Sequence, residues 1–183
     1  LFDPARVVLY LEQQAREEQV KMADSLNQAR FVHFSVHASA NENAPQYSGL
    51  WLASPATPTA ASTGGEDGLL TAEEILKLRL RAELVTLSGC ETGLGREVKG
   101  EGLLGLMQAF FYAGAPAVMV SLWKVDDRAT TDLMVQFYRQ LLSKPSGRSQ
   151  FNQAAALRQA QLSAIQAGNE PYFWASFILA GRG

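Results

Sequence analysis

A single cysteine, Cys90, stands between an apolar run and a glycine-rich run, in the stretch LSGCETGLG from Leu87 to Gly95. A cysteine acts as a nucleophile only as its thiolate, and a nearby histidine can supply the base or cation that forms the thiolate near neutral pH. The chain has two histidines, His33 and His37, both in the stretch FVHFSVH. These residue types could form a catalytic pair, whereas a lone cysteine without such a partner is most often a buried, inert side chain.

The positions of the two histidines in their apolar run distinguish them. His33 lies inside a predicted strand, where we expect a hydrogen-bonded core histidine. His37 ends that strand, just before the polar stretch ASANENAPQ. His37 is therefore the better candidate for the base. The glycines around Cys90 allow close approach of a ligand and leave the Cys90 amide free to point at a developing oxyanion.

Short apolar runs predict the strands that would carry these residues, and they cover residues 31–37, 84–88, 117–123 and 174–179. Two of them, ELVTLSG and AVMVSLW, are apolar on both faces, as in a sheet covered by helices on both sides. Helical patterns cover residues 17–27, 71–76, 102–114, 126–142 and 150–167. This alternation predicts an α/β fold with a mainly parallel sheet, in which functional residues collect at the carboxyl ends of the strands.

Other catalytic motifs fit the sequence less well. The stretch GEGLLG, from Gly100 to Gly105, matches the GxGxxG pattern of dinucleotide-binding loops, but it does not directly follow a predicted strand. We interpret its glycines as a flexible loop that leads into a helix. A serine triad would need a GxSxG elbow, and a zinc site would need a different spacing of cysteine and histidine. We therefore expect no metal and no other cofactor.

Composition narrows the possible partners. With 16 Lys and Arg residues against 18 Asp and Glu residues, the chain has no basic excess, so we do not expect it to bind nucleic acid. One cysteine cannot form an internal disulfide, which is typical of a reducing, cytoplasmic compartment. No apolar run reaches the ~18 residues of a membrane span. The 183 residues are expected to form one domain, and Leu1 suggests a piece of a longer chain.

Four stretches together resemble the CHAT domain family of caspase-like cysteine peptidase domains, which are often attached to tetratricopeptide repeats. They are ARFVHFSVHA, GLLTAEEILKLRLRAELVTLSGCETGLG, GEGLLGLMQAFFYAGAPAVMVSLWKVDD and YFWASFILAG, in order between about Ala29 and Gly181. The family is related to caspases, gingipains and separases. The resemblance implies a three-layer caspase-like fold, with residues 29–183 as the CHAT domain and residues 1–28 as an N-terminal segment leading into it.

The resemblance also assigns roles to residues. His37 matches the catalytic histidine of the family and Cys90 its catalytic cysteine. The backbone amides of Cys90 and Ala38 would form the oxyanion hole. Ala38 stands where the family usually has glycine, which keeps the N–H donor but narrows the backbone dihedrals. Trp123 and Asp126 match a segment near the same edge of the sheet, and with Glu91 they are candidates for substrate contacts.

Two functions follow as alternatives. The first is a cysteine endopeptidase that acts on a protein or peptide, with acidic loop residues that would favour a basic side chain before the cleaved bond. The second is a catalytically silent protein-interaction module on the same fold. In either case an attached repeat domain or a partner protein is expected to control access to Cys90. The glycine-rich loops at residues 55–68 and 91–102 are expected to be mobile without ligand.

Overall fold

The structure is a computed structural model that describes residues 1–53, 67–89, 101–124, 126–143 and 152–182. Its central sheet has four strands in the order β1-β5-β6-β7. Strands β1, β5 and β6 run parallel, and β7 pairs antiparallel with β6. The strands are β1 (Phe31–Phe34), β5 (Leu84–Leu87), β6 (Ala117–Ser121) and β7 (Phe177–Gly181).

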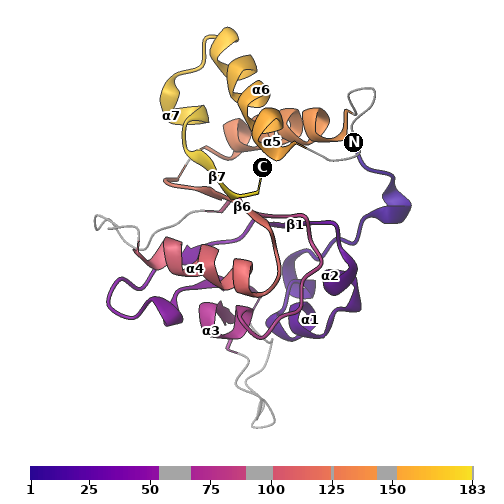
Figure 1. The fold of residues 1–183 in the computed structure, drawn as a ribbon, viewed down its shortest axis with the longest axis vertical. Coiled ribbons are helices and arrows are strands. Elements are labelled where there is room, and N and C mark those ends of the chain that lie inside the picture. The colour runs from indigo at the N-terminus through magenta and orange to yellow at the C-terminus, as the bar shows by residue number, and fades with distance from the viewer. Residues whose placement is uncertain (54–66, 90–100, 125, 144–151, 183) are drawn as a thin grey trace.

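Helices cover both faces of this sheet, as Figure 1 shows. On one face lie α5 (Asp127–Leu142), α6 (Gln153–Gln166) and α7 (Pro171–Trp174). On the other side lie α4 (Glu101–Tyr112), α3 (Ala72–Ile75), α1 (Glu17–Met22) and α2 (Asp24–Gln28). The predicted fold class, a mixed α/β fold with a mainly parallel central sheet flanked by helices, is confirmed, and it is compatible with a caspase-like fold.

Side chains along the central strands point alternately to the two faces of the sheet, and a separate hydrophobic core forms on each face. Val85 and Leu87 of β5 pack in the core on the α4 side, whereas Leu84 packs in the core on the α5 side. All three are fully buried, as expected for a strand with helices on both faces. Phe110 of α4 and Phe137 of α5, both fully buried, are among the large side chains of these two cores.

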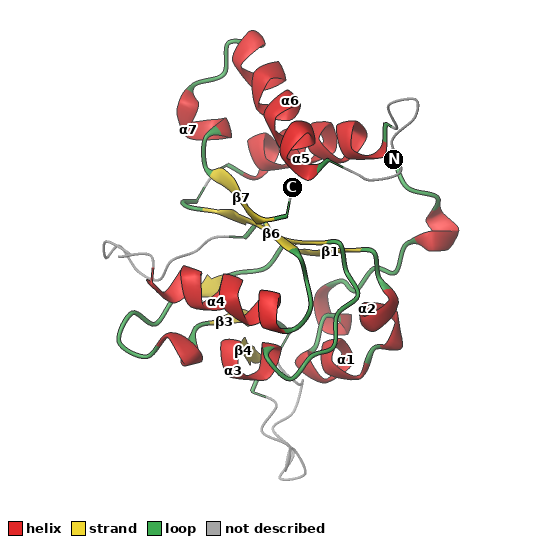
Figure 2. Ribbon diagram, in the orientation of Figure 1, coloured by secondary structure: helices red, strands yellow, loops and turns green. Residues whose placement is uncertain are grey.

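A second, small antiparallel sheet was not expected from the sequence. It has the order β2-β3-β4, and Figure 2 shows β3 and β4 on the α3 and α4 side of the molecule. Its strands are too short for an alternating pattern to stand out. They are β2 (Ala38–Ser39), β3 (Gly49–Trp51) and β4 (Leu69–Thr71), and the 3₁₀ helix η3 (Pro45–Tyr47) lies between the first two.

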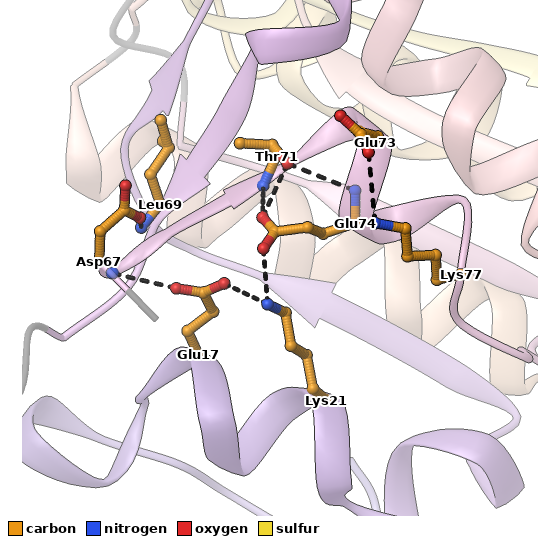
Figure 3. A network of polar contacts seen from close by, with 9 residues as sticks. Glu17, Lys21, Asp67, Leu69, Thr71, Glu73, Glu74 and Lys77 are labelled. Carbon is orange, nitrogen blue, oxygen red and sulfur yellow. Dashed lines mark hydrogen bonds and ion pairs between the residues drawn. The ribbon is translucent and has the colours of Figure 1, made fainter. Parts of the chain in front are cut away.

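The N-terminal segment packs onto this small sheet. Two 3₁₀ helices, η1 (Pro4–Arg6) and η2 (Glu12–Gln14), precede α1. The amide of Ala53, just after β3, donates to the carbonyl of Ala15 over 2.9 Å. A polar network shown in Figure 3 continues the contact: Lys21 binds Glu17 on its own helix and Glu74 of α3, at 2.5 and 2.7 Å.

Several predicted boundaries differ from the structure. The predicted strand 31–37 ends at Phe34, and the predicted strand 174–179 begins only at Phe177, because α7 precedes it. Extended backbone at Ala23 divides the predicted helix 17–27 into α1 and α2. The predicted GEGLLG loop is wrong from Glu101 onward, where α4 begins. The remainder of the two predicted mobile loops lies outside the described residues, apart from residues 67 and 68.

Candidate active site at the carboxyl ends of the parallel strands

The carboxyl ends of β1, β5 and β6 meet at one edge of the central sheet. Phe34, the last residue of β1, pairs with Leu87, the last of β5, and Leu87 pairs with Val120 of β6. The chain therefore leaves all three strands at the same edge, which is where ligands bind in open parallel sheets. His37 and Trp123 follow two of these strands.

His37 lies on the connection from β1 to β2, not on β1 itself as predicted. Its side chain is exposed. Its carbonyl accepts a hydrogen bond of 2.7 Å from the amide of Trp51, which ties this position to β3. The backbone at His37 is thus held by the small sheet, while the imidazole remains accessible to solvent. An accessible imidazole on a fixed backbone can serve as a general acid or base.

The chain just before Cys90 touches the chain just before His37. The Ser88 amide donates to the Phe34 carbonyl over 3.0 Å, which extends the β1–β5 pairing by one bond. A Cβ atom built on Gly89 would lie 1.9 Å from the Val36 carbonyl oxygen, so only glycine permits this approach. Cys90 and Glu91, both predicted site residues, lie outside the described residues.

Ala38 presents its backbone amide on the outer edge of β2. Ala38 pairs with Leu50, and the bond from the Trp51 amide to the His37 carbonyl flanks this pair. In an antiparallel ladder this arrangement makes Ala38 and Leu50 a pair without mutual hydrogen bonds, so the Ala38 N–H points away from β3. Among the described residues only Glu12 has a positive φ without being glycine, so Ala38 adopts ordinary backbone. The alanine therefore does not distort the position at which the family usually has glycine.

His33 has hydrogen-bond partners on both sides of its ring. Nε2 lies 2.7 Å from the Ser88 hydroxyl, and Nδ1 lies 3.2 Å from the Tyr138 hydroxyl. The residue keeps solvent contact on part of its surface, but burial of the ring lowers the pKa of His33 to about 4. The predicted hydrogen-bonded histidine is thus observed, although at the rim of the sheet and not in its core. Ser88 directly follows β5 and Tyr138 belongs to α5. Both are distant from His33 in the sequence, so the local sequence pattern could not predict them as partners.

Trp123 and Asp126 are both held by neighbouring structure. The Trp123 indole donates to the Tyr172 carbonyl over 2.9 Å, and the two rings stack at 6.3 Å. The Asp126 carboxylate accepts from the amides of Arg128 and Ala129 and so caps α5. Trp123 lies at the same sheet edge as His37, while the carboxylate of Asp126 already serves the helix.

The segment after His37 runs against the start of α4. The amide of Glu101 donates to Oε2 of Glu42 over 3.3 Å, so a carboxylate lies at the positive end of this helix. A Cβ on Gly102 would lie 2.8 Å from that of Ala40 and 2.9 Å from the Ser48 hydroxyl oxygen. Gly102 and Gly105, the two described glycines of the GEGLLG stretch, thus serve close packing of α4 against the β2–β3 connection.

The described residues include no group of three or more acidic, histidine or cysteine side chains that could hold a metal ion. None of the helices that the structure describes is long and apolar enough to cross a membrane.

Comparison with known proteins places this geometry in a family. The family model described as CHAT domain matches residues 1–182. The mouse protein named Tetratricopeptide repeat protein 28 is 37% identical over 113 residues, which is 62% of this chain and 4% of that protein. The human protein of the same name is 34% identical over 113 residues, with the same shares covered. The chain thus spans only a small fraction of these curated relatives, but the family match covers nearly all of it, and the chain belongs to the CHAT domain family.

Proposed function

We propose that this chain is a cysteine endopeptidase of the caspase-like type, with Cys90 as nucleophile and His37 as acid and base. The observation that carries the proposal is the contact between Gly89 and Val36, because it joins the positions that immediately precede the two residues. Parallel pairing of β1 with β5 supports it by directing both connections to one edge of the sheet.

The reaction would proceed in two steps. The Cys90 thiolate attacks the scissile carbonyl carbon, and the amides of Cys90 and Ala38 stabilise the oxyanion. As the C–N bond breaks, His37 gives a proton to the leaving amine, and a thioester remains. His37 then takes a proton from water, whose oxygen attacks the thioester carbon. The C–S bond breaks, a carboxylic acid leaves, and the starting pair of Cys90 thiolate and protonated His37 is restored.

The orientation of Ala38 supports this assignment. Its N–H lies on the outer edge of β2, away from the β2–β3 ladder, so the ladder does not occupy it. Glu91, Trp123 and Asp126 are proposed to contact the substrate. Trp123 is half-buried, so part of its surface is accessible to an apolar group of the substrate. A basic side chain before the cleaved bond would suit the acidic residues of these loops.

The name of the mouse and human relatives refers to tetratricopeptide repeats, and we propose that repeats or a partner protein control this site in the whole protein. We also propose a cytoplasmic location, because a reactive thiol without a disulfide partner suits a reducing compartment. Under this proposal the 183-residue chain by itself cleaves generic peptides slowly, and a partner that favours the competent arrangement raises the rate.

The test combines thiol alkylation with peptide cleavage. Cys90 is the only cysteine, so iodoacetamide reports on this thiol alone, and its rate against pH gives the thiol pKa. We expect a midpoint below the ordinary value of about 8.5, and we expect His37→Ala to raise it toward that value. Cleavage of a quenched-peptide library should vanish in Cys90→Ala and His37→Ala but persist in Ser163→Ala, a control on the exposed face of α6. If His37→Ala leaves the alkylation profile unchanged, and the longer protein with its partners cleaves nothing, the chain is an interaction module instead.

A further inference from the structure

We propose that His33 and Ser88 are positioning residues for the reaction proposed above: their hydrogen bond fixes the chain at Gly89 and so sets where Cys90 stands relative to His37. The inference rests on the proposed function. It assigns a role to a histidine that sequence reasoning treated as structural, and to a serine that it did not consider.

The first support is that β1 holds Ser88 twice. The Ser88 amide donates to the Phe34 carbonyl over 3.0 Å, and its hydroxyl lies 2.7 Å from His33 Nε2. One bond fixes the backbone and the other fixes the side chain, and both partners belong to the strand that leads to His37. The next residue, Gly89, then lies against the Val36 carbonyl. The chain is therefore held by β1 up to the residue before Cys90.

The second support is the direction of the hydrogen bonds. Tyr138 donates its hydroxyl proton to Thr86 Oγ1 over 3.2 Å, so its oxygen is left to accept from His33 Nδ1–H. His33 Nε2 then carries the lone pair and accepts from the Ser88 hydroxyl. Tyr138 is 7% exposed and Thr86 fully buried, so the ring of His33 is fixed from the interior of the protein. The relay gives Ser88 one defined orientation.

The third support is that the hydrogen-bonded chain of Tyr138, His33 and Ser88 stays uncharged across the neutral pH range, in which a catalytic thiol–imidazole pair acts. Burial lowers the pKa of His33 to about 4, so Nε2 keeps its lone pair across the neutral range. Tyr138 also stays protonated, because burial raises its pKa to about 12. The described residues show no carboxylate bonded to His33, so no neighbouring charge converts it into a cation. The hydrogen bonds that hold Ser88 therefore keep the same protonation state between pH 5 and 9.

The experiment measures the alkylation of Cys90 by iodoacetamide against pH in the 183-residue chain. In Ser88→Ala we expect the thiol midpoint to rise by about one unit. This lowers the thiolate fraction roughly tenfold, and because the more basic thiolate is intrinsically more nucleophilic, alkylation at pH 6.5 slows about threefold. Where cleavage is measurable, kcat should fall with KM unchanged, since the substrate contacts remain.

Matched variants separate positioning from general damage. Ser88→Thr keeps the hydroxyl and should restore the wild-type profile, while Ser163→Ala on α6 should not disturb it. His33→Ala should act like Ser88→Ala, and the double variant should be no worse than either, because both remove the same bond. Thermal unfolding of each variant shows that the folded chain is being measured.

The outcomes are distinct. If His37→Ala shifts the pH profile of Cys90 alkylation but Ser88→Ala and His33→Ala do not, the positioning role is overturned and the proposed function stands. A Ser88→Thr profile that matches Ser88→Ala overturns the hydrogen bond as its basis. A profile that His37→Ala does not shift overturns the Cys90–His37 pair, and the positioning role with it.

Discussion

His33 and His37 belong to one short stretch of chain, yet they meet different surroundings. Both ring nitrogens of His33 lie within hydrogen-bond distance of a hydroxyl, of Tyr138 and of Ser88, and burial of the ring lowers its pKa to about 4. His37 is exposed, on a connection whose backbone is tied to β3. Proton transfer to a leaving amine needs a ring that is accessible to the substrate. In the proposed reaction, proton transfer is therefore assigned to His37, and His33, which is hydrogen-bonded on both ring nitrogens, has the supporting role.

The lowered pKa of His33 predicts a dependence of stability on pH. Its ordinary value is 6.5, so between pH 6.5 and about 4 the unfolded chain binds a proton that the folded chain does not. Stability then falls as pH decreases through this window and is unaffected by His33 above it. We expect the stability of wild type relative to His33→Gln to decline over this range in urea titrations. A constant difference from pH 7 to pH 4 would contradict a lowered pKa of His33 in the folded chain.

Ala38, the proposed oxyanion donor, leads to a prediction. Its φ is not positive, and the residue is 6% exposed within β2. Glycine would relieve no strain there, and it costs roughly 0.5–1 kcal/mol in a strand because more backbone freedom is lost on folding. We expect Ala38→Gly to lower the unfolding free energy by about that amount and to leave the cleavage rate unchanged. Markedly faster peptide cleavage by Ala38→Gly would show that alanine holds the proposed donor out of place.

At the scale of elements, the ionic network of Figure 3 fastens α1 to α3. Glu74 forms a capping box with Thr71: its carboxylate accepts from the Thr71 amide, and its own amide donates to the Thr71 hydroxyl oxygen. The Glu74 carboxylate also binds Lys21. Burial alone would raise the pKa of Glu74, but the hydrogen bonds from Lys21 and Thr71 outweigh it and lower the pKa to about 2. Glu17, 2% exposed, joins the network by accepting from the Gly68 amide. The Glu74 carboxylate thus links the start of α3 to Lys21 in the N-terminal segment.

Glu74→Gln tests this link. The amide keeps part of the cap but loses the charge, so we expect a loss of about 1 kcal/mol at pH 7. Because the folded pKa is lowered, the contribution is present above the ordinary value of 4.5 and disappears as pH falls toward 2. Glu73→Gln is the control, since its pair with Lys77 is exposed at both ends and is worth little. Equal losses in the two variants would contradict the network.

Close approach of β1 and the end of β5 gives a further prediction. Gly89→Ala would place a Cβ 1.9 Å from the Val36 carbonyl oxygen, so the two connections must separate. We expect a loss of roughly 1–3 kcal/mol in unfolding free energy, typical of overpacking, together with slower alkylation of Cys90 at neutral pH. In Gly105→Ala the new Cβ would meet a Pro45 side-chain atom at 3.1 Å, and helix propensity offsets part of the strain. Gly89→Ala should therefore be the more damaging of the two.

Elements with strong local signals were predictable from the sequence. The capping box at Thr71 and Glu74 and the buried run of β5 appear where the sequence places them. The small sheet was not predictable from the sequence. Its strand β2 has only two residues and depends on its pairing with β3, which lies about ten residues further along the chain. The site shows the same division. His37 could be chosen as a candidate from the sequence because it comes after an apolar run. The proposed role of Ser88 could not, because it depends on a hydrogen bond to His33, which is distant in the sequence.

At the scale of the whole molecule, residues 1–28 are tied to the rest of the chain at several points. Phe2 packs against Tyr138 with ring centroids 5.5 Å apart, Val20 lies in the core on the α4 side, and Ala15 accepts from the Ala53 amide. Ala53 closely follows Trp51, whose amide holds the His37 carbonyl. The N-terminal segment therefore supports the strand that fixes His37, and it reaches α5 on the opposite side of the sheet.

Removal of residues 1–28 is the test at this scale. The shortened chain would lose Lys21 opposite Glu74, the bond to Ala53 and the apolar contacts of Val20. We expect thermal unfolding at a clearly lower temperature and faster hydrogen exchange at the Trp51 amide, because β3 loses its neighbour on this side. Removal of residues 1–9 alone is the control: it loses the Phe2 ring contacts but keeps α1 and the network, so the Trp51 amide should stay protected. The prediction is contradicted if the chain beginning at Ala29 unfolds at the wild-type temperature and its Trp51 amide is still protected from exchange. The N-terminal segment would then have no part in holding His37, and any control from an attached domain would have to reach the site by another route.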